Sequence, residues 1–128
     1  MSGQSLISNV VPKAVTITIA TDAKLSNAVN CQGLVLIGIE LPATWTTSNI
    51  TFRGTAIVKH SDAVAADYKD LVDEDNALIT WTAVAQNQIL LTLPATPMIA
   101  GLQSIRIRSV TDQEANRTVT LLFAVPNP

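Results

Sequence analysis

Apolar and polar residues alternate along several short stretches of this chain, at residues 15–19, 50–55, 105–108 and 118–121. Successive side chains of a β-strand point to opposite faces, so each stretch predicts a strand with one buried and one solvent-facing side. The outward positions carry mostly threonine instead of lysine and glutamate. Such a surface suits a protein that lies against other protein.

Turn-forming residues separate further strand patterns along the rest of the chain. Residues 34–41 are apolar on both faces, as in a central strand covered on two sides, and Pro42 ends the run because proline cannot donate to a ladder. Helix signals are nearly absent, although residues 59–66 could form one helical turn. The other strands are expected at residues 13–20, 25–29, 50–58, 68–72, 78–83, 87–93, 102–110 and 117–125.

These strands need partners for their apolar sides. A single sheet of this size would leave one apolar face bare, so two packed sheets are expected. Short strands at regular spacing are typical of an antiparallel sandwich or barrel. The pattern therefore predicts an all-β fold, an antiparallel two-sheet β-sandwich of about eight strands.

Residues 1–12 precede the first expected strand and are interpreted as an N-terminal arm, which leaves residues 13–128 as a single β-sandwich domain. The apolar residues of the arm are Leu6, Ile7, Val10 and Val11. They could pack on their own domain or on a neighbouring subunit, or the arm could be a frayed terminus. We take these four residues as candidates for a subunit or capsid contact.

Charged residues make up 14% of the 128 residues, against roughly 25% in an average soluble domain, and 48% of the chain is hydrophobic. The low charge favours a protein whose surface is covered in an assembly, with a soluble domain rich in neutral polar residues as the alternative. The net charge is −2, and only Arg106 and Arg108 share a strand face. Nucleic-acid binding, which needs a concentrated positive field, is therefore not expected.

No membrane association is expected, because the longest apolar run, residues 34–41, is too short to cross a bilayer. The N-terminus lacks the basic start and the continuous apolar stretch of a secretory signal. Cys31 is the one cysteine, so no internal disulfide can form, and a buried inert thiol made in a reducing cytoplasm is expected.

Few side chains suggest catalysis. His60 is the one histidine, and Ser61 and Asp62 follow it directly. Adjacent residues point in different directions and cannot form a catalytic triad. The chain has no glycine-rich phosphate loop, no Cys-x-x-Cys pair and no paired catalytic carboxylates. We therefore expect no enzymatic activity and no cofactor.

Acidic residues gather at Asp67, Asp70 and residues 73–75. They lack the spacing of a calcium-binding EF-hand loop, which needs alternating ligands, a central glycine and a terminal glutamate. A solvated acidic turn is the better interpretation. It leaves weak calcium binding at Asp73, Asp75 and Asn76 open.

Three aromatic residues have two possible roles. Trp81 lies within an apolar strand, and Trp45 follows Pro42 where it could plug one end of a sandwich, so packing in the core or at an edge is the first prediction. The alternative is that Trp45 and Tyr68 are exposed and stack on the ring faces of a glycan.

Five segments, residues 38–46, 50–52, 67–73, 100–109 and 116–118, together resemble a group of small proteins that tailed bacteriophages encode among their virion structural genes. The resemblance spans residues 34–125. It implies a jelly-roll-like β-sandwich that serves as an auxiliary capsid (decoration) protein or a tail protein, with no catalytic residues to carry over. It also implies a virion protein made in the host cytoplasm.

The first functional hypothesis is accordingly a decoration or cement protein that binds the outer surface of a phage shell and stabilises it. Its partners would be the major capsid protein or other virion subunits, and it would form homo-oligomers, with a trimer favoured. The alternative is a carbohydrate-binding module that attaches the virion to host surface glycans. The sandwich also resembles such modules, although residues 65–68 lack the Asp-Gly turn that usually precedes the tyrosine.

Overall fold

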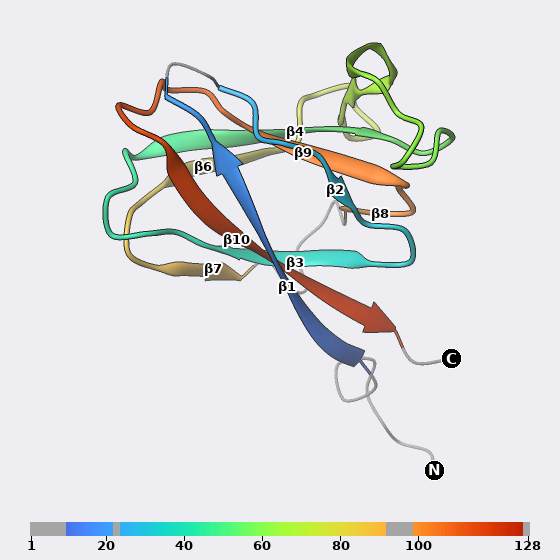
Figure 1. Ribbon diagram of the computed structural model, residues 1–128, viewed down its shortest axis with the longest axis horizontal. Helices are drawn as coiled ribbons and strands as arrows, with labels where there is room; N and C mark the ends of the chain where they lie inside the picture. Colours follow the sequence, from blue (N-terminus) through green and yellow to red (C-terminus); the bar gives the residue numbers. More distant parts are fainter. Residues whose placement is uncertain (1–9, 22–23, 92–98, 127–128) are drawn as a thin grey trace.

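The computed structural model describes residues 10–21, 24–91 and 99–126 of the chain. Two antiparallel sheets of five strands each lie face to face (Figure 1). This arrangement confirms the predicted all-β, two-sheet β-sandwich. No helix in these ranges is long and apolar enough to cross a membrane.

The strands are short except at the two ends of the chain. In sequence order they are β1 (Val10–Ile19), β2 (Val29–Asn30), β3 (Val35–Glu40), β4 (Ser48–Thr55), β5 (Lys69–Asp70), β6 (Thr80–Val84), β7 (Ile89–Leu91), β8 (Ile99–Ala100), β9 (Ser104–Ser109) and β10 (Arg117–Pro126). A short 3₁₀ helix, η2 (Ala65–Asp67), overlaps the end of the segment expected to form a helical turn.

Sheet A has the order β1-β10-β3-β7, and β8 also pairs with β3. Sheet B has the order β2-β9-β4-β5, and β6 also pairs with β4. Along β4, β6 pairs with residues 48–51 and β5 with residues 53–54, so the two strands occupy one line. Along β3, β8 and β7 share a line in the same way. The ten strands therefore fill eight positions, which agrees with the expected number.

The pairs β1·β10, β2·β9, β3·β7/β8 and β4·β5/β6 are nested, since the first position pairs with the last and the fourth with the fifth. This is the pairing of one long antiparallel ribbon folded over into two sheets. It is the arrangement of a jelly roll, the form of β-sandwich that the resemblance implies.

The core lies between the sheets and is built from the alternate residues that the period-2 pattern marks as inward-facing. The fully buried aliphatic and aromatic side chains of the long strands are Ile17, Ile19, Ile39, Ile50, Phe52, Ile105, Ile107, Val119, Leu121 and Phe123. Burial of each such side chain contributes roughly 1.5–3 kcal/mol. Cys31 belongs to this core and is buried, as expected.

Several boundaries differ from the sequence-based expectation. β1 begins at Val10 and not at residue 13, so Val10 and Val11 of the expected arm pair with β10, at Pro126 and Val125. Leu6 and Ile7 lie outside the described residues. The weak strand at residues 25–29 is reduced to a bridge at Leu25 before β2.

The connection between the strands expected at residues 87–93 and 102–110 contains a further strand, β8. Its two residues, Ile99 and Ala100, pair with β3 at Leu36 and Val35. Two residues are too few for the alternation of a strand to be recognised in the sequence, so this strand exists only because β3 offers it an edge.

Candidate functional site

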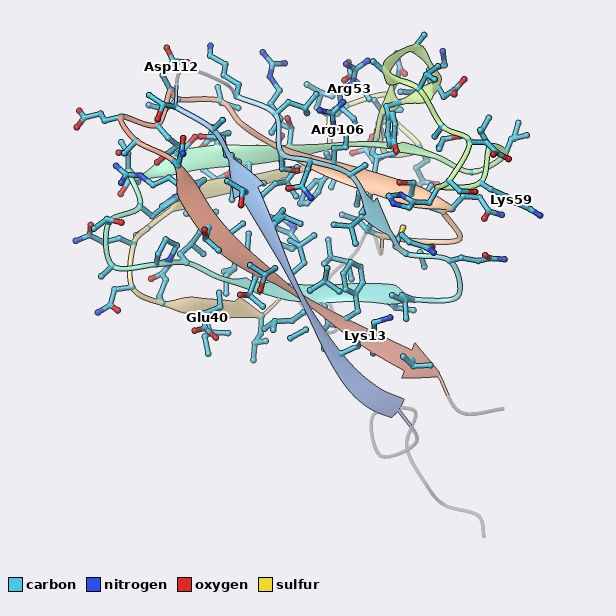
Figure 2. The ribbon with its side chains drawn as sticks, in the orientation of Figure 1. Lys13, Glu40, Arg53, Lys59, Arg106 and Asp112 are labelled. Atoms are coloured by element: carbon cyan, nitrogen blue, oxygen red, sulfur yellow. The ribbon has the colours of Figure 1, made fainter. Side chains whose placement is uncertain are left out.

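Three arginines lie side by side on the outward face of sheet B. Arg53 of β4 is directly opposite Arg106 of β9, and Thr51 is opposite Arg108. Phe52 and Ile107, one residue along, point into the core, so the arginines face outward. We call Arg53, Arg106 and Arg108 the arginine row. Figure 2 shows Arg53 and Arg106 together on the sheet B side, away from Glu40 and Lys13 of sheet A.

Backbone carbonyl groups hold two of these guanidinium groups in place. Arg106 donates from Nε to the carbonyl oxygen of Ser26 at 2.7 Å, and its guanidinium carbon lies 5.6 Å from the centre of the Tyr68 ring. Arg53 donates from Nη2 to the carbonyl oxygen of Tyr68 at 2.9 Å. The Nε of Arg53 lies 3.2 Å from Asp70 Oδ1, but without the alignment of a hydrogen bond.

The row carries more positive charge than its surroundings neutralise. Within the described part of the chain, Asp70 is the one carboxylate that pairs with it. Like charges directly opposite on neighbouring strands repel each other. Each guanidinium has five N–H donors, and the bonds that fix Arg53 and Arg106 use only one or two of them. An oxyanion such as a carboxylate is the chemical group that such donors bind best.

An acidic turn lies beside the row at the edge of sheet B. The N–H of Leu71 donates to the carbonyl oxygen of Phe52 in β4, and after Leu71 the chain turns away from this strand. It returns at Ile79, whose N–H donates to the carbonyl oxygen of Leu71. Asp73 Oδ1 accepts the N–H groups of Asp75 at 2.8 Å and Ala77 at 3.0 Å, which fixes the turn. We call residues 73–75 the acidic turn. In the described residues, no group of three His, Cys, Asp or Glu side chains is placed to hold a metal ion.

His60 and Tyr68 meet at Ser104, which is fully buried. Ser104 Oγ lies 2.8 Å from His60 Nδ1, 2.8 Å from the Tyr68 hydroxyl and 3.1 Å from the carbonyl oxygen of Val29. The carbonyl can only accept, so Ser104 donates its proton there and both other groups donate to Ser104. His60 is therefore a donor to this serine and not its base, and the cluster fastens the segment after β4 onto sheet B.

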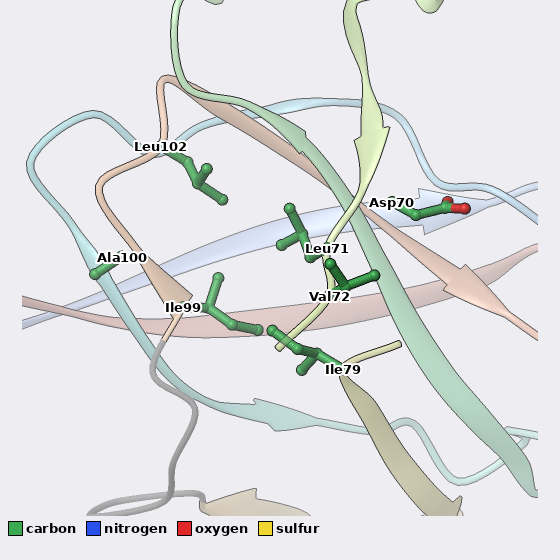
Figure 3. A pocket seen from close by; sticks show the side chains of 7 residues that line it. All are labelled: Asp70, Leu71, Val72, Ile79, Ile99, Ala100 and Leu102. Atoms are coloured by element: carbon green, nitrogen blue, oxygen red, sulfur yellow. The ribbon is translucent and has the colours of Figure 1, made fainter. Parts of the chain in front are cut away.

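An apolar pocket of about 330 Å³ opens between the two sheets (Figure 3). Asp70 at its rim is the one charged residue that lines it. The other lining residues are Leu71, Val72, Ile79, Ile99, Ala100 and Leu102. A ligand site of this size usually has several converging polar groups that orient the ligand, whereas Asp70 carries the one polar side chain among the described residues that line this pocket.

Trp45 and Tyr68 are only 2% and 4% exposed, which contradicts the alternative that these two rings are exposed and stack on a glycan. Trp45 belongs to the buried core and donates from Nε1 to the carbonyl oxygen of Val84 at 3.0 Å. Tyr68 is covered by Arg106. Both rings have the packing role that was the first prediction, and neither offers a free face to a sugar.

The outward face of sheet A is poor in charge. The strand registers place its side chains in rows that cross the sheet. One row runs Thr16, Thr120, Glu40 and Ile89, and the next runs Ala14, Leu122, Gly38 and Leu91. Ile89 and Leu91 are 57% and 65% exposed. We call these two rows the threonine–leucine face.

The edge of sheet A formed by β1 is only partly open to pairing with another strand. Thr18 of β1 is blocked, because its N–H donates to Asn27 Oδ1 at 2.8 Å and its carbonyl oxygen accepts the N–H of Asn27 at 3.3 Å. Pro12, an even number of residues from Thr18, also presents its backbone to this edge. Because proline has no N–H, it cannot donate to an added strand. Proline and lysine on an edge strand discourage pairing with another strand, and Lys13 follows Pro12. The face is therefore more accessible to a partner than the edge.

No family model, curated protein or solved structure matches this chain. Its candidate surfaces are therefore known from geometry alone. The sequence pattern indicated that Arg106 and Arg108 share a face, but it gave no sign that Arg53 joins them. Only the register between β4 and β9 could have revealed this.

Proposed function

We propose that the protein is a structural subunit of a larger assembly, for which the resemblance favours a bacteriophage virion, and that it binds the shell as a decoration protein. The threonine–leucine face is the observation that carries this proposal. It combines neutral hydroxyl groups with two exposed aliphatic side chains, Ile89 and Leu91. Exposed apolar groups on a charge-poor face favour contact with another protein surface.

The proposed mechanism is mechanical. Each copy lies across neighbouring shell subunits and buries the threonine–leucine face between them. Apolar surface removed from water contributes roughly 25 cal/mol per Å². Many weak contacts repeated over a shell add to a large total, because copies held on one lattice bind at a high effective concentration. The shell would then resist internal pressure better with the protein bound than without it.

The test compares two double variants in a co-sedimentation assay with empty shells of the cognate major capsid protein. Ile89→Lys with Leu91→Lys should reduce binding at least about tenfold, because each lysine must be desolvated at the contact. Ile57→Lys with Val64→Lys is the matched control, since both residues are exposed but lie between β4 and β5 in the chain. Equal binding by the two variants, with both still folded by circular dichroism, would contradict the proposal.

The expected arm contact needs a separate deletion. Removal of residues 1–9 spares β1, which begins at Val10, whereas removal of residues 1–12 would shorten this strand. If Leu6 and Ile7 bind a neighbouring subunit, the deletion should abolish shell binding while the sandwich still unfolds cooperatively. Unchanged binding would leave the threonine–leucine face as the whole contact.

A further inference from the structure

We propose that two copies of this chain associate through sheet B, with the acidic turn of each copy docked on the arginine row of the other. This contact uses the opposite side of the sandwich from the threonine–leucine face. It would leave that face free for a shell, and it can be tested without one. The proposal therefore does not depend on the proposed function.

The arginine row is prepared for carboxylate groups that it does not hold. Arg106 and Arg53 are anchored by the carbonyl groups of Ser26 and Tyr68, so little side-chain freedom is lost when they bind. Within the ranges that the structure describes, the side chain of Arg108 makes no hydrogen bond or ion pair. Two opposed arginines with free donors favour a partner that supplies negative charge.

The acidic turn has the matching chemistry. Asp73 is occupied with the backbone of the turn, which leaves Glu74 and Asp75 exposed at its tip. The described residues contain two ion pairs, Lys24–Asp112 and Arg53–Asp70, and neither involves this tip. Its two carboxylates are thus available to another copy.

Apolar side chains at the base of the turn add area to the contact. Val72 and Leu78 form an antiparallel bridge there, and both are exposed. Surface ion pairs alone contribute only about 0–1 kcal/mol each. Burial of this aliphatic pair beside the charges would supply a part of the binding energy that does not depend on salt.

The row and the turn are close enough to form one self-complementary surface. Arg53 is paired with Asp70 across β4 and β5. Asp73 follows Asp70 by three residues, which span at most about 11 Å. A positive patch adjacent to a negative patch matches its own copy across a two-fold axis, where each contact occurs twice. A dimer, and not the trimer favoured from the sequence, is the expected form in solution.

A charge-swap experiment tests the contact. The row variant carries Arg106→Glu and Arg108→Glu, and the turn variant carries Glu74→Arg and Asp75→Arg. Sedimentation equilibrium at low ionic strength should give a dimer for the wild type. Each variant alone should raise the dimer Kd at least about tenfold, because like charges then face each other. An equimolar mixture should form a one-to-one dimer again. In this dimer the acidic row of one variant meets the basic turn of the other, and the unchanged arginine row meets the unchanged acidic turn, so both contacts pair opposite charges.

Two controls keep the result interpretable. Lys13→Glu with Lys59→Glu changes the net charge as much as the row variant but lies outside the row, and it should leave the dimer intact. Arg108→Glu alone replaces the row variant if loss of the Ser26 contact unfolds the protein. A monomeric or trimeric wild type, or a variant mixture that stays monomeric, would overturn the proposal. Shell binding is measured separately and would stand in either case.

Discussion

At the scale of single residues, buried polar side chains in this protein serve to hold segments together. Gln113 is fully buried, and both the oxygen and the nitrogen of its side-chain amide form hydrogen bonds with other segments of the protein. Its Oε1 accepts the N–H of Thr46 at 2.9 Å and its Nε2 donates to the carbonyl oxygen of Thr46 at 3.0 Å and to Ser109 Oγ at 3.0 Å. The loop before β4 is thereby fastened to the loop between β9 and β10.

Replacement of Gln113 by leucine should lower the free energy of unfolding by about 2–4 kcal/mol, because both backbone groups of Thr46 lose their partner in a partly buried site and Ser109 loses a donor. Urea denaturation measures the loss. Gln32→Leu is the matched control, since Gln32 is exposed, and it should change stability by less than about 0.5 kcal/mol. Similar losses in the two variants would contradict a locking role for Gln113.

Because of Cys31, the stability of the folded protein should decrease at alkaline pH. Burial raises the pKa of this thiol from 9.0 to about 11. The unfolded chain therefore loses the thiol proton at a lower pH than the folded chain. The contribution to stability is complete below about pH 9 and is lost as the pH rises toward 11, by an amount of about 2–3 kcal/mol.

Unfolding of the wild type and of Cys31→Ala by urea at several values between about pH 8 and pH 11 tests this expectation. The wild type should lose more stability over this range than the variant, because the other titrating groups are common to both. Parallel curves for the two proteins would show that the thiol does not titrate differently in the folded state.

At the scale of elements, short strands depend on the long strands they flank. β7 has three residues and lies against β3, where Gly38 is opposite Leu91. A Cβ atom on Gly38 would be 2.5 Å from the carbonyl oxygen of Leu90 and 3.0 Å from a methyl group of Leu91. Because Gly38 has no side chain, β7 can lie close to β3. The same position is part of the threonine–leucine face, beside Leu91.

Gly38→Ala should therefore displace β7 and cost about 1–3 kcal/mol. Amide hydrogen exchange should show that residues 89–91 lose protection while β1 and β10 keep theirs. Gly33→Ala is the comparison, because Gly33 has a φ of +76° and a methyl group there would meet no atom within 4 Å, so its cost is one of backbone conformation alone. Intact protection of β7 in Gly38→Ala would contradict this account.

At the scale of the whole molecule, the nested pairing brings the two ends of the chain together. β10 lies between β1 and β3 in sheet A and contributes Val119, Leu121 and Phe123 to the core. The partners Ile17 and Val119 are far apart in sequence. Such pairing has a high entropic cost of loop closure, so folding should be slow, on a scale of roughly milliseconds to seconds.

A chain that ends at residue 116 should consequently fail to fold, because β1 and β3 would both lose their neighbour. Circular dichroism and urea titration should then show no cooperative transition. The chain that begins at residue 10 is the control, and it should unfold cooperatively with nearly the stability of the full chain. A cooperative transition in the chain without β10 would contradict its central role.

What the sequence could determine depends on local rules. The alternation of apolar and polar residues is written into each segment, so the fold class, most strands and the inward positions such as Ile17 and Phe52 could be predicted. The scarcity of charge indicated a surface suited to protein contacts. Trp45 could be assigned to packing for the same kind of reason, since a large ring beside apolar strands gains most by burial.

The candidate surfaces depend on contacts between distant segments, which no local pattern encodes. The β4–β9 register places Arg53 against Arg106, and the closeness of Arg106 to Tyr68 removes that ring from solvent. The same kind of register leaves Ile89 and Leu91 uncovered at the edge of sheet A. A shift of one residue in either pairing would reverse which side chains face outward. Tertiary structure therefore decided the surfaces, while the sequence by itself determined the sandwich that carries them.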